Sequence, residues 1–263
     1  MKNVVPRTVA IALASVMLVP AVLVAQVLET ETARPLRPGQ IEAGIGYELQ
    51  HSREGDEFAV PFAFELGLTN RIGLLVEPVP YTAIRPELGT SATGPGDLEV
   101  TLSFLVRAES RRMPALALAV EEKFPTAHDP LIGTGRPDHA AYLIASKRLA
   151  RFDVHANVGY TIVGSPRGQS LTNRIMGALA TEFFLTRSTL FYGELLGSTS
   201  ASRGEGAPTP PGTPAAPEVS GDEILATIGA AHSLGGNARY SFGITRDNIG
   251  AIQLRPGLTL WFR

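Results

Sequence analysis

The chain has 263 residues, of which 44% are hydrophobic and 18% charged, with 27 Gly, 20 Pro and no Cys. Its many turn formers and few charges argue against a long-helix or coiled-coil protein, and its ordinary apolar content argues against disorder. A formal net charge of −2 gives no support to nucleic acid as a partner. The lack of cysteine excludes disulfides, thiolate zinc sites, thiol catalysis and a cysteine-linked lipid anchor.

Residues 1–25 have the layout of a secretory signal peptide. Lys2 and Arg7 form a positive start, and an apolar run with small residues at its end continues to Ala25. An uncleaved anchor helix is the alternative, but the run is no longer than the roughly 20 residues that a spanning helix needs. We therefore expect cleavage, which leaves residues 26–263 as the mature chain.

The mature sequence alternates between apolar and polar or small residues. In 40–50, five apolar side chains from Ile41 to Leu49 occupy every second position, which predicts a strand with one apolar and one polar face. Segment 58–68 repeats this pattern. Ten further strands are predicted at 71–83, 96–108, 114–124, 139–149, 152–163, 173–186, 188–199, 222–233, 236–246 and 251–262, which makes twelve.

The connections between these strands alternate in length. Short turns are predicted at 69–71, 109–113, 150–151, 187 and 234–235, and longer loops at 51–57, 84–95, 125–138, 164–172, 200–221 and 247–250. This alternation is typical of outer-membrane barrels, which have brief periplasmic turns and longer extracellular loops. An even strand number places both chain ends in the periplasm. Segment 200–221 is proline-rich, so we expect an extended extracellular loop rather than a second domain.

Three features favour a membrane barrel over a secreted soluble β-sandwich that binds ligands. Strands of about ten residues are long for a sandwich but fit a tilted membrane crossing. The polar faces mix small residues with charge, which suits a confined lumen, and the signal peptide provides the export route. Near the chain end, Leu258, Leu260 and Phe262 lie at period two, similar to the signal read by the outer-membrane assembly machinery, although here Arg263 follows the aromatic residue. We predict an all-β fold, a single antiparallel up-and-down transmembrane barrel of about 12 strands in the outer membrane of a Gram-negative-type bacterium.

Several residues conflict with regular strands. Proline removes a hydrogen bond from a β-ladder, and a closed barrel has no free edge to accommodate it. The prolines within predicted strands are Pro61, Pro78, Pro80 and Pro256. Pro78 and Pro80 are expected to end the third strand early. Glu122 falls on the lipid side, so either a β-bulge near Glu121 reverses the alternation or Glu122 lies at headgroup level.

Three short motifs resemble one known family. Gly-Pro-Gly-Asp at 94–97 precedes a strand, Lys-Phe-Pro-Thr at 123–126 opens a loop with Gly-Thr-Gly at 133–135, and Asn-Val-Gly-Tyr-Thr at 157–161 is followed by Gly164. In this order they resemble the outer-membrane barrel family of transporters labelled with the MetA pathway of phenol degradation, over most of the mature chain. Here an alanine follows Pro-Thr where the family usually has glycine. The resemblance implies passage of small, often aromatic or hydrophobic compounds, and it supplies no catalytic motif.

The predicted inner face collects charged and titratable residues. The candidate pore-lining residues are Glu42, Glu48, Glu65, Glu77, Glu99, Glu121, Lys123, Asp153, His155, Glu182, Glu194, Arg239 and Arg255. Eight-stranded barrels are filled by their own side chains, and barrels of sixteen strands have an open channel. With twelve strands, the lumen is expected to be either a narrow pore or plugged. The charges form either a selective eyelet or a network of ion pairs. Because the last strand closes against the first, Arg255 is predicted to face Glu48.

Signals for catalysis, cofactors or metals are weak. His232-Ser233 and His51-Ser52 lack the surroundings of a nucleophile, and His128 and His139 with adjacent aspartates are too few ligands for a specific metal site. We therefore expect no enzyme, no cofactor and no metal. A small-molecule channel is the leading function, with a non-conducting structural or surface-binding barrel as the alternative. The expected partners are outer-membrane lipid, the assembly machinery through the C-terminal strand, and small solutes, but not nucleic acid.

Overall fold

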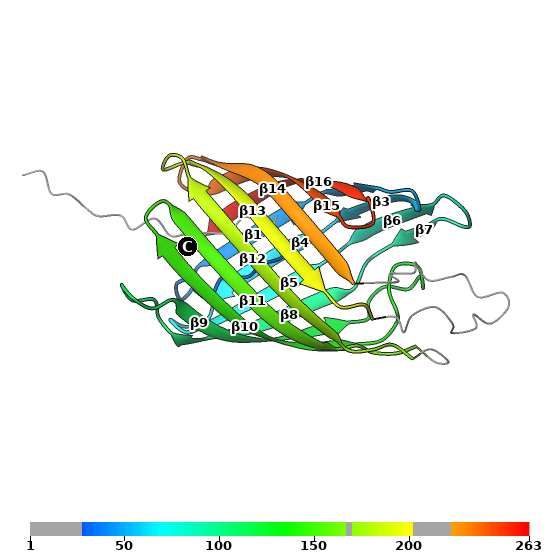
Figure 1. The fold of residues 1–263 in the computed structure, drawn as a ribbon, viewed down its shortest axis with the longest axis horizontal. Helices are drawn as coiled ribbons and strands as arrows, with labels where there is room; N and C mark the ends of the chain where they lie inside the picture. Colours follow the sequence, from blue (N-terminus) through cyan, green and yellow to red (C-terminus); the bar gives the residue numbers. More distant parts are fainter. Residues whose placement is uncertain (1–27, 167–169, 202–221, 263) are drawn as a thin grey trace, which may run out of the picture.

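The computed structural model describes residues 28–166, 170–201 and 222–262. They form sixteen strand segments in one closed antiparallel sheet, in which β16 pairs with β1 (Figure 1). The predicted signal peptide, 1–25, and nearly all of the proline-rich loop, 200–221, lie outside the described residues. The segments are β1 (Ile41–Gly46), β2 (Glu48–His51), β3 (Gly55–Val60), β4 (Phe62–Gly67), β5 (Ile72–Pro78), β6 (Tyr81–Pro86), β7 (Ala92–Gly94), β8 (Leu98–Arg107), β9 (Ala115–Phe124), β10 (Asp138–Leu149), β11 (Phe152–Ile162), β12 (Arg174–Phe184), β13 (Thr189–Ser198), β14 (Glu223–Leu234), β15 (Ala238–Asp247) and β16 (Ile252–Phe262).

The sixteen segments occupy twelve positions around the barrel. β1 and β2, β3 and β4, β5 and β6, and β7 and β8 are each two parts of one strand, and every neighbouring pair is antiparallel. The predicted twelve-stranded antiparallel barrel is therefore confirmed. The soluble β-sandwich alternative is wrong, because the strands close into one barrel instead of forming two packed sheets. No helix in the described residues is long and apolar enough to cross a membrane.

The prolines explain why the first four strands are divided. Pro61 separates β3 from β4, and Pro80 lies between β5 and β6. Two proline carbonyls accept hydrogen bonds at these breaks: Gly46 N–H donates to Pro61 O, and Tyr47 N–H donates to Pro256 O, both at 2.9 Å. At the break before Pro80, Gly96 N–H donates to Val79 O at 2.7 Å. The barrel thus tolerates the missing N–H groups, because pairing is interrupted where they would be needed.

The prediction that Pro78 and Pro80 end the third strand is wrong. The strand resumes at Tyr81, and β6 pairs with β3 on one side and β7 on the other. The strands are consequently longer than predicted, and the loops expected at 51–57 and 84–95 shorten to 52–54 and 87–91. From β8 onward, the predicted strand ends agree with the structure within two residues.

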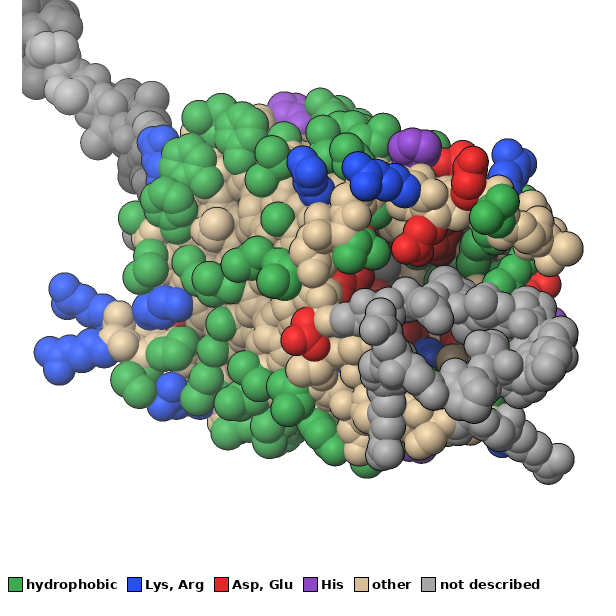
Figure 2. Space-filling view, turned by 45° about the vertical axis from the view of Figure 1, so that its right-hand side comes forward, with side chains coloured by type: hydrophobic (Ala, Val, Ile, Leu, Met, Phe, Trp, Pro, Cys, Tyr) green, Lys and Arg blue, Asp and Glu red, His purple; other side chains and the backbone are tan. Residues whose placement is uncertain are grey.

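The outer face of the barrel is apolar and the inner face is polar. Large hydrophobic side chains stand exposed around the wall, including Val158 at 60% and Ile228 at 70% (Figure 2). Buried charged residues, in contrast, lie on the inner face. Such a distribution is the reverse of that in a soluble protein and requires an apolar solvent around the barrel.

Glu122 lies on the outer face without any bulge. The β9–β10 register runs unbroken from Asp138↔Lys123 to Ser146↔Ala115, so the alternative of a bulge near Glu121 is wrong. Its carboxylate is paired with His139 Nδ1 at 2.5 Å, close to the long-loop end of β9. The pair gives the Glu122 carboxylate a polar partner at the edge of the apolar surface.

Gly229 provides the space for an inward-facing tyrosine. Tyr192 lies directly opposite it, and a Cβ on Gly229 would be 2.2 Å from the Tyr192 hydroxyl oxygen and 2.4 Å from Phe242 O. We expect Gly229→Ala to lower the free energy of unfolding by about 1–3 kcal/mol, since the tyrosine must leave its position. Gly177→Ala is the matched control, because its Cβ would meet nothing within 4 Å. Urea unfolding followed by Trp261 fluorescence tests this, and equal effects of the two substitutions would contradict it.

Candidate functional site

A segment that precedes the first strand lies inside the barrel. We call residues 28–40 the strap. Gly39 N–H donates to Gly67 O at the short-turn end, and from there the strap folds back into the lumen. Its residues Thr30, Ala33 and Leu36 are buried against the inner wall. Sequence patterning did not identify the strap, which has no alternating pattern of its own.

Side chains of the wall hold the strap by its backbone. Ser146 Oγ accepts from Ala33 N–H at 2.8 Å, and Glu194 Oε1 accepts from Thr30 N–H at 2.7 Å. The Asn157 carboxamide accepts from the N–H of Glu31 (2.7 Å) and donates to its carbonyl (3.1 Å). These contacts satisfy polar groups of an extended chain that has no ladder partner of its own.

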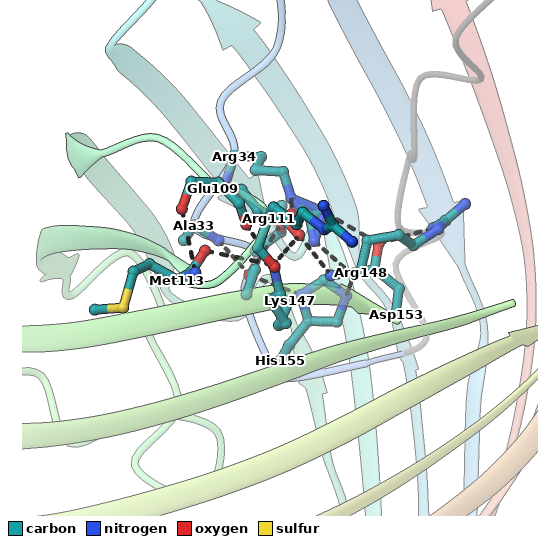
Figure 3. A network of polar contacts seen from close by, with 12 residues as sticks. Ala33, Arg34, Glu109, Arg111, Met113, Lys147, Arg148, Asp153 and His155 are labelled. Atoms are coloured by element: carbon teal, nitrogen blue, oxygen red, sulfur yellow. Dashed lines mark hydrogen bonds and ion pairs between the residues drawn. The ribbon is translucent and has the colours of Figure 1, made fainter. Parts of the chain in front are cut away.

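Arg34 is the strongest electrostatic anchor of the strap. Its guanidinium makes two hydrogen bonds to Asp153, Nη1 to Oδ2 at 3.0 Å and Nη2 to Oδ1 at 2.5 Å (Figure 3). Arg148 Nη1 donates to the same Oδ2 at 2.9 Å, and its guanidinium lies 4.0 Å from the centre of the Phe184 ring. The Asp153 side chain is fully buried. A buried carboxylate that accepts hydrogen bonds from two guanidinium groups is held strongly and in a fixed direction. We call Arg34, Arg148 and Asp153 the latch.

Glu109 extends the latch into the turn between β8 and β9. It forms ion pairs with Lys147 at 3.0 Å and Arg34 at 3.7 Å, and it accepts from Arg148 N–H at 3.0 Å. Partial burial acts to raise the pKa of Glu109, but the hydrogen bonds from Lys147 and Arg148 outweigh it and lower that pKa below its ordinary value. Glu109 therefore stays ionised at neutral pH and helps to fix Arg34.

Asp153, His155 and Glu182 form a buried cluster under the strap. Their possible ligand atoms all lie within 4.8 Å of one another. Ser146 Oγ is 2.8 Å from His155 Nδ1, while His155 Nε2 and Glu182 Oε2 have no hydrogen-bond partner among the described residues. Both Asp153 oxygens already accept from guanidinium groups, so a metal ion would have to displace them. The donor set therefore fits a salt-bridged anchor better than a metal site.

Ser146, His155 and Asp153 also have the residue types of a nucleophilic triad, but not its arrangement. Ser146 is 1% exposed and accepts from the strap, and His155 Nε2 is 3.9 Å from Asp153 Oδ1. A nucleophile must reach its substrate, and this hydroxyl is covered. At the sequence-adjacent pair, His232 contacts Thr189 at 2.9 Å instead of Ser233.

Carboxylates dominate the opposite side of the lumen. One glutamate comes from each of five neighbouring strands, β1, β4, β5, β8 and β9. We call Glu42, Glu65, Glu77, Glu99 and Glu121 the acidic arc. Glu42 lies opposite Glu65 in the register, and Glu77 opposite Glu99. Glu31 of the strap lines the same cavity as Glu42, Glu65 and Glu77, so it adds a sixth carboxylate from the lumen side.

The predicted contact across the barrel closure is present. Arg255 Nη2 donates to Glu48 Oε1 at 2.8 Å, which confirms the pairing expected from the sequence. The same nitrogen donates to Glu29 Oε1 of the strap at 2.7 Å. Glu42 accepts from Trp261 Nε1 at 2.9 Å. The strap is thus tied to the closing strand as well as to β10 and β11.

Small cavities lie beside the strap. Two cavities of about 20 and 50 Å³ flank it, and Glu31, Thr32 and Glu65 line both of them. One water needs roughly 10–15 Å³ measured in this way. These two cavities have room for a few waters and are too small for an aromatic solute.

Of the thirteen residues singled out on the predicted inner face, seven are buried and six are partly buried. Lys123 forms ion pairs with Asp138 at 2.5 Å and with Asp97 at 3.7 Å, so it is engaged beside the acidic arc. The structure brings Asp153, His155 and Glu182 together but separates them from Arg255. Sequence reasoning missed the strap residues Glu29, Thr30, Glu31 and Arg34 and their wall partners Ser146 and Asn157.

No protein-family model and no curated protein matches the sequence. Several solved structures share the fold. The COG4313 outer membrane channel from Pseudomonas putida F1 superposes with a TM-score of 0.65 at 12% identity, covering 89% of this chain and 100% of that one. The KdgM porin in complex with disordered oligogalacturonate gives 0.55 at 10%, covering 84% and 99%. The NanC porin gives 0.56 at 9%, covering 84% and 98%. At such identities the similarity establishes the barrel fold.

Proposed function

We propose that this protein is an outer-membrane channel for small solutes whose lumen is narrowed by the strap. The observation that carries the proposal is the reversed polarity of the barrel, with an exposed apolar wall outside and a charged lumen inside. The fold shared with outer-membrane channels and porins supports it. The protein acts by positioning charged groups along a passage, so no catalytic role is assigned to them.

The proposal includes an orientation and a route of export. The short turns and the end of β16 at Phe262 face the periplasm, and the longer loops face outside. Residues 1–25 direct export and are removed, and β16 with its C-terminal aromatic residue is recognised by the assembly machinery. Glu122 and His139 then lie at the outer headgroup level, where charge costs little.

The acidic arc narrows the class of solute. Six carboxylates including Glu31 face a lumen in which Arg34, Arg148 and Arg255 are already bound to carboxylates. The negative electrostatic potential of these six carboxylates favours passage of cations and neutral molecules over anions. The resemblance to the MetA family extends the proposal to small aromatic or hydrophobic compounds, and the arc favours their uncharged or amine-bearing members.

A closed barrel with a structural or surface-binding role is the second candidate. The strap favours it, because the strap lies in the lumen and the two cavities described beside it are too small for an aromatic solute. Conductance distinguishes the two candidates. A folded barrel with heat-modifiable gel mobility that never conducts supports the closed role.

Reconstitution of the mature chain in planar bilayers under a KCl gradient tests the channel. We expect a reversal potential of the sign for cation selectivity, because the acidic arc concentrates cations. Replacing Glu65 and Glu99 together by glutamine should lower the cation-to-anion permeability ratio. Glu122→Gln on the outer face is the matched control and should leave the ratio unchanged. Anion selectivity of the unmodified chain would contradict the proposed role of the arc.

A further inference from the structure

The short-turn end of the barrel carries a row of unopposed arginines. Four of its five turns contain exposed arginine, and the fifth, 235–237, has no charge. We call these residues the arginine rim: Arg71, Arg111, Arg112, Arg151 and Arg187. Basic side chains project from this end of the molecule in Figure 2. None of the five forms an ion pair with any residue that the structure describes.

The single acidic residue of these turns does not neutralise the rim. Glu109 is bound by Lys147, Arg34 and the Arg148 N–H. At the other end, the described loop residues include four acidic side chains and only Arg53 and Arg136 as strong bases. Among the described connecting segments, the excess of positive charge is therefore confined to the short-turn end.

Aromatic side chains mark the level at which the rim begins. Phe152 immediately follows Arg151, and it lies opposite Phe183, which in turn lies opposite Phe191 on the next strand. The Phe152 and Phe183 rings are 5.0 Å apart, and Phe152 and Phe191 are about half exposed on the outer wall. Aromatic girdles of this kind lie at the boundary between hydrocarbon and headgroups. The arginines just beyond the girdle thus reach the headgroup layer.

We propose that the arginine rim binds the phosphate groups of anionic phospholipids in the leaflet at the short-turn end. Guanidinium groups bind phosphate through two parallel hydrogen bonds, and basic side chains near a membrane surface are attracted to anionic lipid. The rim runs over the turns between β4 and β13, so it contacts lipid around more than half of the barrel. This inference rests on the proposed membrane placement.

The test compares the refolded barrel in vesicles of phosphatidylcholine alone and in vesicles that also contain phosphatidylglycerol. We expect phosphatidylglycerol to raise the urea midpoint of unfolding, and added NaCl to reduce that shift by screening. A variant with R111Q, R112Q, R151Q and R187Q should lose more than half of the shift. The matched control, R53Q with R136Q at the other end, should keep it.

Two outcomes overturn the inference. An equal shift in the rim variant and the control would show that the lipid effect does not involve the rim. Inorganic phosphate that reproduces the shift in phosphatidylcholine vesicles would assign the rim to soluble phosphate instead of lipid. Heat-modifiable gel mobility and conductance are recorded on the same samples. If the unmodified chain shows neither heat-modifiable mobility nor conductance, the channel proposal fails. If it folds and conducts but its stability does not depend on phosphatidylglycerol, only the proposed lipid binding by the rim is refuted.

Discussion

A mature chain that begins at Gly39 is expected to conduct several-fold more current per channel than the chain that retains the strap. The strap lies inside the lumen, and two of the cavities beside it have volumes of about 20 and 50 Å³. Strand pairing begins at Ile41, so the truncation removes no ladder hydrogen bond of the wall. Single-channel recording in planar bilayers measures the change, and heat-modifiable gel mobility verifies that the barrel folds.

Because the chain has no cysteine, an engineered disulfide can fix the strap to the wall, and reduction can release it again. Thr32 Oγ1 lies 3.4 Å from Ser146 Oγ, so T32C and S146C place two thiols at a contact between strap and wall. The oxidised protein should conduct no more than the unmodified chain, and the truncated protein should conduct more than both. A truncated barrel that folds but has unchanged conductance would show that ions pass elsewhere, and the proposed role of the strap would be discarded.

The barrel was predictable because the signal for it is local. Within each strand, apolar and polar residues alternate. The inward position of Glu42, Glu182 or Arg255 therefore follows from counting residues within one segment. Arg255 could be paired with Glu48 because closure of an even barrel makes the last strand a neighbour of the first.

The strand breaks depend on neighbouring strands and were therefore predicted incorrectly. Pro61 is tolerated because Gly46 N–H reaches its carbonyl from the adjacent strand, and Pro256 lies opposite the break at Tyr47. The early end expected at Pro80 did not allow for a strand that stops and then resumes in register with β3. Proline in a sequence indicates an interruption of the ladder, but only the partner strand decides whether the strand ends there.

The strap could not be found from the sequence because its contacts are long-range and irregular. Arg34 contacts Asp153, 119 residues away, and Arg255 contacts Glu29 across 226 residues. Side chains from β10, β11, β13 and β16 converge on a segment with no periodic pattern. The only local sign is that charged residues, Glu29, Glu31 and Arg34, precede the first strand, and this is equally typical of a solvated terminus.

Asp153→Asn is expected to lower the free energy of unfolding by about 3 kcal/mol, near the lower end of the cost of breaking a buried ion pair. The amide keeps the shape of the carboxylate but leaves Arg34 and Arg148 close together without their shared anion. Both arginines are about one-quarter exposed, so water offsets part of the loss. Urea unfolding in vesicles measures the effect. Asp56→Asn, in the exposed pair with His51, is the control and should change stability little.

The same substitution separates the latch from the rest of the strap. Ser146, Asn157 and Glu194 still hold the strap backbone when Asp153 is neutral, so conductance should rise less than on truncation. In the truncated chain, Asp153→Asn should cost less than in the full mature chain, because Arg34 is absent and Arg148 alone is affected. The difference between the two costs is the coupling of Asp153 to the strap. If Asp153→Asn destabilises both chains equally, the carboxylate acts only within the wall, and the strap is held by its backbone contacts alone.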